Sequence, residues 1–159
     1  MHLVFIHKKI FNPLKNLLKE GITPEKLALS LSCGITIGSF PILGSTTVIC
    51  IVIALALRLN LIAIQIGNWL AYPLQLILIV PFILLGDRLF GSPAIPNPQA
   101  LSALFRSDML EAFRVMSDAV FHAIVAWAAV APIALLCLYL IFLPVFNHLL
   151  SGMRRGRSS

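Results

Sequence analysis

Three long stretches of the chain contain no charged side chain. They are residues 27–57, 59–86 and 119–153, and most of their residues are apolar. Each stretch is longer than the ~20 apolar residues that a helix needs to cross a bilayer. The pattern therefore predicts an all-α, polytopic membrane helical bundle.

The first uncharged stretch, 27–57, does not fit a simple crossing. As one helix it would be ~46 Å long, well beyond the ~30 Å hydrocarbon core, and it is too short for two crossings. Helix-breaking residues gather at its middle, where Gly38, Pro41 and Gly44 follow one another. We therefore expect two half-length helices that form a re-entrant hairpin. Its two ends, Lys26 and Arg58, would lie at one membrane face.

The second uncharged stretch, 59–86, also has a polar and broken middle. Its members are Gln65, Gly67, Asn68, Tyr72, Pro73 and Gln75. The stretch is compatible with one kinked crossing or with a second hairpin. In the third stretch, Pro132 and Pro144 are expected to kink or end the helix, because proline removes a backbone donor.

The chain is expected to form a single membrane domain over 1–159. Its expected parts are a basic interfacial helix (1–22), the re-entrant and membrane helices (23–90), a Pro-rich loop with an amphipathic helix (91–118), a terminal membrane helix (119–150) and a basic tail (151–159). Five lysines precede residue 27 and three arginines lie in the tail. Since cytoplasmic segments are rich in Lys and Arg, both termini are expected in the cytoplasm, which requires an even number of crossings.

Composition excludes several classes of protein. Of the 159 residues, 59% are hydrophobic and 11% are charged, whereas soluble domains are about a quarter charged. The chain is therefore neither a soluble globule, a disordered segment nor a coiled coil. The net charge of +6 comes from basic residues near the ends, which fits a membrane orientation and not a nucleic-acid partner.

A set of residues, in their order along the chain, is similar to the pattern of a known family. It consists of Thr23-Pro24-Glu25-Lys26-Leu27-Ala28, Gly34, Gly38, Pro41, Gly44, Thr46, Arg58-Leu59-Asn60-Leu61, Gly67 and Pro73. Over about 10–90 it resembles the bacterial integral-membrane family known as domain of unknown function twenty-sixty-two. The resemblance implies a small protein of the bacterial inner membrane with no agreed activity, and some members are joined to glycosyltransferase domains. Ser45 and Tyr72 depart from the family pattern, which has Gln or His and Asn there, and this implies a different ligand or affinity if these positions touch one.

The candidate binding site lies at the predicted break. If the second half-helix starts at Ser45, its free N–H groups and positive dipole end suit an anionic headgroup or carboxylate at mid-membrane. The candidate ligand-binding residues are Ser45, Thr46 and Thr47, joined from the second stretch by Asn68, Tyr72 and Gln75. The alternative is that Ser45 only caps its own helix, and that the three residues of the second stretch bond to backbone freed by Pro73.

Two other groups of residues have structural interpretations beside the functional one. Ser30, Gly34 and Gly38 recur every four residues and would let another helix approach closely, which packing alone explains. Lys26 and Arg58 would flank the mouth of the hairpin, or simply extend to the interface.

The sequence indicates no catalytic residue, metal site or cofactor. No carboxylate lies within the three stretches, and no glycine-bracketed serine motif supports a nucleophile. His122 and His148 are too far apart to share a metal, and each is expected to be an isolated polar residue. Cys33, Cys50 and Cys137 are expected to act as small hydrophobic residues.

Two functions follow from these features. The first is a transporter or lipid-handling protein that admits an anionic headgroup or small solute to the broken-helix site, as a homo-oligomer among membrane lipids. The alternative is a non-catalytic assembly or accessory protein that holds another envelope membrane protein, for an envelope-polymer or glycosyltransferase system. An enzyme is not expected.

Overall fold

The computed structural model describes residues 23–91, 103 and 105–155. These form helices α3 (Pro24–Gly38), α4 (Thr46–Ala56), α5 (Leu61–Phe90) and α7 (Met109–Arg155), with no strand in the described ranges. This confirms the all-α prediction. The predicted interfacial helix 1–22, most of the Pro-rich loop and the last four residues of the basic tail lie outside the described residues.

The residues at the two ends of helix α3 explain where it begins and where it ends. The Thr23 hydroxyl accepts a hydrogen bond from the Lys26 N–H at 3.4 Å, and Pro24 stands in the first turn, where its missing N–H costs nothing. At the other end, the Ser39 hydroxyl donates to the Thr36 carbonyl at 2.7 Å. Residues 39–45 then connect α3 to α4.

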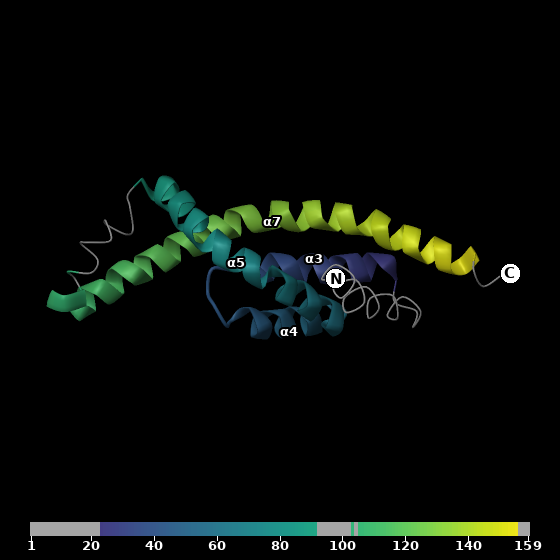
Figure 1. Ribbon diagram of the computed structural model, residues 1–159, viewed down its shortest axis with the longest axis horizontal. Coiled ribbons are helices and arrows are strands. Elements are labelled where there is room, and N and C mark those ends of the chain that lie inside the picture. The colour runs from purple at the N-terminus through teal and green to yellow at the C-terminus, as the bar shows by residue number, and fades with distance from the viewer. Residues whose placement is uncertain (1–22, 92–102, 104, 156–159) are drawn as a thin grey trace, which may run out of the picture.

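The first uncharged stretch is divided into two helices, with the break between Gly38 and Thr46. Gly44 adopts φ +84°, a left-handed conformation that glycine takes without strain. Helix α4 then runs back beside α3, so that Lys26 and Arg58 lie at one end of the molecule (Figure 1). Whether this pair enters and leaves a membrane by the same face stays a prediction.

Helix α5 is continuous over 30 residues, with Pro73 and Pro81 inside it. The Asn60 side chain caps its start by accepting from the Ala63 N–H at 2.8 Å. The alternative of a second hairpin in this stretch is therefore wrong. Helix α5 passes the α3–α4 break and continues beyond it (Figure 1).

Helix α7 has 47 residues and continues through Pro132 and Pro144. The expected amphipathic helix and the expected terminal membrane helix are thus one element, and the two prolines do not end it. Proline is tolerated in long apolar helices when neighbouring helices and local adjustments satisfy the freed backbone groups. Helix α7 lies along both α3 and α5, and its C-terminal end is at the same end of the molecule as the start of α3 (Figure 1).

Helices α3 and α5 are in backbone contact at a set of glycines. A Cβ atom at Gly34 would collide with the Ile64 carbonyl oxygen, and one at Gly67 would lie 2.5 Å from the Leu31 carbonyl oxygen. A Cβ at Gly38 would lie 2.7 Å from the Ala71 Cβ. The glycines therefore set the distance between the two helices, and the amide side chains of α5 come close to the break.

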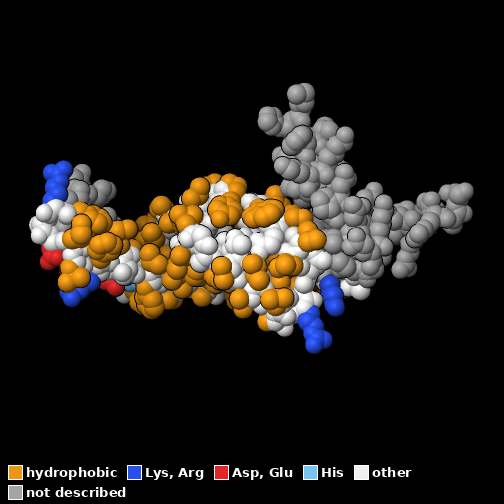
Figure 2. Space-filling model, turned by 90° about the horizontal axis from the view of Figure 1, so that it is seen from below, with side chains coloured by type: hydrophobic (Ala, Val, Ile, Leu, Met, Phe, Trp, Pro, Cys, Tyr) orange, Lys and Arg blue, Asp and Glu red, His pale blue; other side chains and the backbone are white. Residues whose placement is uncertain are grey.

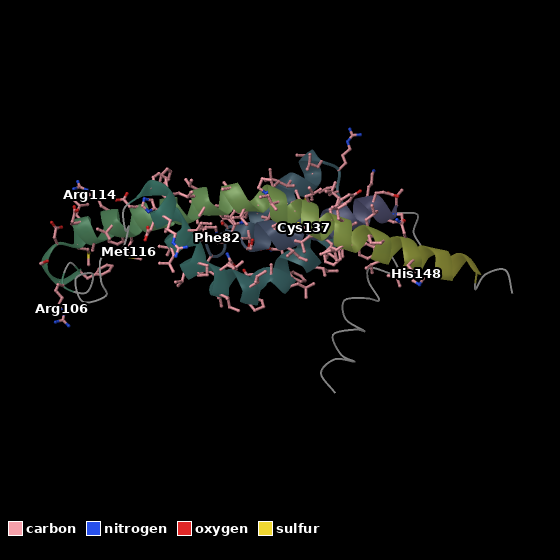
Figure 3. All side chains as sticks on the ribbon, turned by 90° about the horizontal axis from the view of Figure 1, so that it is seen from above. Phe82, Arg106, Arg114, Met116, Cys137 and His148 are labelled. Atoms are coloured by element: carbon pink, nitrogen blue, oxygen red, sulfur yellow. The ribbon has the colours of Figure 1, made fainter. Side chains whose placement is uncertain are left out.

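Apolar side chains cover most of the molecule between its two ends. Helices α5 and α7 are long and apolar enough to cross a membrane by length and composition. In Figure 2 the hydrophobic side chains occupy the middle, while the Lys and Arg side chains lie at the two ends. Arg106 and Arg114 mark one of these ends (Figure 3).

Replacing Gly34 by Ala is expected to lower the free energy of unfolding by about 1–3 kcal/mol, the usual cost of overpacking. The new methyl group would meet backbone atoms of α5, which cannot rotate away as a side chain can. Thermal unfolding in a mild detergent measures the change. Ala128→Val, on an exposed face of α7, is the control and should change stability little. Equal stability of Gly34→Ala and the unmodified protein would contradict the backbone contact.

Candidate functional site

The α3–α4 break lies at the middle of α5. At one end of the molecule, Ala63 packs with Leu27 and Phe146; at the other, Asp87 bonds to His122 of α7. Gln75 is halfway along α5 between these two contacts, ~18 Å of helix rise from each. Since the Gln75 side chain bonds to the break, the break lies at mid-length of the helix.

Amide side chains of α5 bond to the backbone and hydroxyl groups at the break. The Gln75 Nε2 donates to the carbonyls of Phe40 at 2.6 Å and Ile42 at 3.3 Å. The Gln65 Nε2 donates to the Thr47 carbonyl at 3.2 Å. The bonds of Gln75 satisfy carbonyls of the connection, which belong to no helix, whereas the Gln65 bond adds a donor to a carbonyl in the first turn of α4.

Asn68 completes this network. Its Nδ2 donates to the Thr47 Oγ1 at 3.3 Å and to the Gln65 Oε1 at 3.4 Å. The structure thus brings Thr47 and Asn68 of the predicted site together, while Gln75 bonds to the connection that precedes Thr46. The amides bond to the α3–α4 connection and to the start of α4. The alternative interpretation expected them to bond to backbone freed by Pro73 instead.

Ser45 and Tyr72 take no part in this network. The Ser45 hydroxyl donates to the Ile42 carbonyl at 3.0 Å, and its side chain accepts no bond from α4. Tyr72 is 39% exposed on the outside of α5. The first N–H groups of α4 therefore have neither an intrahelical acceptor nor the Ser45 side chain to satisfy them.

Some polar atoms at the break are buried and have no partner among the described residues. Thr46, Asn68 and Gln75 are fully buried. Their oxygens Thr46 Oγ1, Asn68 Oδ1 and Gln75 Oε1 accept and donate no hydrogen bond in the described part of the chain. A buried polar atom without a partner costs about 1–3 kcal/mol, so these three atoms mark a place where a ligand would gain free energy.

Helix α7 holds the end of α3 through a residue that the sequence did not indicate. The Trp127 Nε1 donates to the Thr36 carbonyl and to the Ser39 hydroxyl, both at 3.2 Å. Its ring packs edge-on against Phe40, with the ring centroids 4.9 Å apart. The C-terminal end of α3 is thus fixed on two sides, by α5 and by α7.

Lys26 and Arg58 lie far from the break, as the expected mouth of the hairpin requires. Both are exposed, at the beginning of α3 and just after α4. Arg58 has φ +51°, a left-handed conformation that reverses the chain into α5.

His122 is not an isolated residue, so that expectation is wrong. Its Nδ1 lies 2.8 Å from the Asp87 Oδ1, and its ring stacks on Phe90 with centroids 4.3 Å apart. A Cβ at Gly86 would collide with the His122 backbone, so glycine is needed for this approach. The expectation for His148 is wrong too, because His148 also has an interaction partner.

One family model matches the chain. It carries the description of an uncharacterised protein conserved in bacteria (DUF2062), and it matches residues 8–152. The match therefore extends through α7, well past residue 90, where the resemblance seen in the sequence ends. No curated protein and no solved structure shows significant similarity.

Replacing Gln75 by Leu is expected to destabilise the protein by about 1–3 kcal/mol, because the part-buried Phe40 carbonyl would lose its donor, while the Ile42 carbonyl would keep only the Ser45 hydroxyl. Thermal unfolding in detergent measures the loss. Asn147→Leu removes an exposed amide of α7 and serves as the control, with an expected change below about 0.5 kcal/mol. A similar small change for Gln75→Leu would show that the break does not depend on this side chain.

Proposed function

Since the chain belongs to the uncharacterised bacterial family DUF2062, its activity has to be inferred from its own geometry, and we propose that it is an integral membrane protein that binds and moves an anionic headgroup or small solute. The binding site is the α3–α4 break. The start of α4, with the buried and unpartnered Thr46 hydroxyl, carries this proposal.

The distribution of charge supports the membrane assignment. Lys26 and Arg58, at the beginning of α3 and just after α4, lie at one end of the bundle. Asp87 and Arg88, in the last turn of α5, lie toward the other end, where Arg106 and Arg114 are also found (Figure 3). About 36 Å of α5 separates Ala63 from Asp87, which is close to the thickness of the hydrocarbon core with its boundaries. In this arrangement α5 and α7 cross the bacterial inner membrane, α3 and α4 re-enter, and both termini lie in the cytoplasm.

The electrostatics of the break support an anionic ligand. The first N–H groups of α4 carry a partial positive charge, which acts most strongly where water is excluded. Thr46 adds a hydroxyl donor at the same helix end. None of the side chains bonded at the break is ionisable, so binding does not have to overcome a fixed negative charge there.

The same features lead us to propose no catalytic step. The side chains at the break are amides, hydroxyls and an indole, which are weak acids and bases. Two crossing helices and one hairpin are also few for a complete translocation path. We therefore assign the activity to a homo-oligomer in contact with membrane lipids.

Cysteine labelling tests the re-entrant geometry. In a background with Cys33→Ala, Cys50→Ala and Cys137→Ala, the single variants Lys26→Cys and Arg58→Cys should react with an impermeant maleimide from the same side of sealed vesicles. Arg88→Cys should react from the opposite side. Labelling of Arg58→Cys from the side opposite to Lys26→Cys would mean that this stretch crosses the membrane, and would refute the hairpin.

Movement of a fluorescent lipid in reconstituted vesicles tests the function. Protein vesicles should expose inner-leaflet labelled phosphatidylglycerol to an outside quencher faster than protein-free vesicles, and should expose labelled phosphatidylcholine no faster. Thr46→Val, which removes one donor to an anion, should slow exposure about tenfold.

Ser32→Ala is the matched control for that variant. The Ser32 hydroxyl is also buried and unpartnered, but it lies ~9 Å of helix rise before the end of α3. Its removal should leave the rate unchanged. If the unmodified protein gives the protein-free rate, or if Thr46→Val and Ser32→Ala behave alike, anion movement at α4 is excluded.

A further inference from the structure

The break presents acceptors as well as donors, which restricts the ligand beyond its charge. Thr46 and the first N–H groups of α4 can donate to an anion. The unpartnered oxygens of Asn68 and Gln75 can only accept. A bare anion would satisfy the donors and be repelled by these two amide oxygens, so charge alone does not describe what fits.

The orientation of the two amides follows from their partners. The Gln75 Nε2 faces two backbone carbonyls, which only accept, so its Oε1 is the atom left over. The Gln65 Nε2 faces the Thr47 carbonyl, which leaves the Gln65 Oε1 to accept from Asn68. The Asn68 Nδ2 is therefore its bonded atom, and the Asn68 Oδ1 is a free acceptor.

The spacing of these acceptors indicates the size of the ligand. Asn68 and Gln75 lie on one face of α5, seven residues or ~10.5 Å of rise apart. Asn68 contacts Thr47 beside the start of α4, whereas Gln75 contacts Phe40 and Ile42 in the connection. A single hydroxyl has one hydrogen and can pair only one of these acceptors. A ligand that pairs both acceptors therefore carries at least two donors.

We propose that the ligand is a phosphate anion that carries hydroxyl groups, such as a glycerol phosphate or sugar phosphate, either as a lipid headgroup or as a free solute. This rests on the proposed function. The phosphate oxygens accept from Thr46 and the α4 N–H groups, and the hydroxyls donate to the Asn68 Oδ1 and Gln75 Oε1. Such a ligand pairs the three buried oxygens of Thr46, Asn68 and Gln75.

Helix α4 is the element that has to move to admit this ligand. Among its residues only Thr46, Cys50 and Ala54 are buried, whereas Val48 is 63% and Leu55 71% exposed. Two bonds of Thr47, to Gln65 and Asn68, hold α4 to α5. Helix α3 is held more firmly, by backbone contact with α5 and by Trp127. The ligand therefore enters between α4 and α5, while α3 stays in place.

Trp127 provides a reporter for binding. The chain has two tryptophans, and Trp69→Phe at an exposed position of α5 leaves only Trp127, whose N–H is bonded at the break. Its fluorescence is followed while neutral-detergent micelles receive phosphatidylglycerol, phosphatidylpropanol or phosphatidylcholine. Phosphatidylpropanol has the size and charge of phosphatidylglycerol without the two hydroxyls.

Phosphatidylglycerol should half-saturate the signal at a concentration about tenfold below phosphatidylpropanol, since two hydrogen bonds to buried acceptors are lost. Thr46→Val should weaken both lipids and keep their ratio, because the phosphate is common to both. Ser32→Ala should change neither. Glycerophosphoglycerol, the water-soluble headgroup, identifies the source: competition at similar concentrations supports a free solute, and failure to compete supports a lipid.

Equal half-saturation by phosphatidylglycerol and phosphatidylpropanol overturns the hydroxyl requirement and leaves the anion site standing. Equal half-saturation by all three lipids, or a signal that no lipid changes, overturns the anion site as well. The two failures are therefore distinguishable in one titration.

Discussion

The backbone contact between α3 and α5 is the constraint on which the rest of the structure depends. Gly34 and Gly67 are placed so that neither helix could approach the other with any larger residue there. This contact fixes the position of α3 along α5. It thereby brings the amide side chains of α5 level with the connection to α4. Had the helices been a side chain further apart, Gln75 could not reach the carbonyls of Phe40 and Ile42.

An interrupted helix inside an apolar bundle has to find partners for its backbone polar groups. Here the end of α3 and the start of α4 differ in whether their backbone groups have partners. The carbonyl side, at the end of α3 and in the connection, is satisfied because the Trp127 indole and the Gln75 amide supply donors. The amide side, at the start of α4, receives no capping side chain from Ser45. At the break the carbonyls therefore have donors, whereas the first N–H groups of α4 have no acceptor. An anion would accept from these N–H groups.

The sequence predicts the parts of this arrangement that depend on neighbouring residues. The run from Gly38 to Gly44 breaks any helix by itself, and the absence of charge over 27–57 requires that break to lie in an apolar surrounding. The contacts of Trp127 and of Asp87 with His122 could not be predicted, because they join residues far apart in the sequence and depend on how α7 packs. The predicted candidate site includes Tyr72 with Asn68 and Gln75, but the Tyr72 side chain lies on the outside of α5 and is 39% exposed. Which side of α5 faces the break depends on how the helices pack, and the order of residues does not give it.

The differing attachment of α3 and α4 also limits which motion can accompany binding. Displacing α3 would separate backbone from backbone and remove the bonds of Trp127, whereas displacing α4 breaks the two bonds of Thr47 and exposes few buried side chains. A ligand that pairs Thr46, Asn68 and Gln75 gains most where these atoms have no other partner, and it gains that free energy only when α4 has moved to admit it. Binding and the movement of α4 are for this reason coupled. The oxygens whose burial without a partner costs free energy are the ones that stabilise the open state when the ligand is bound.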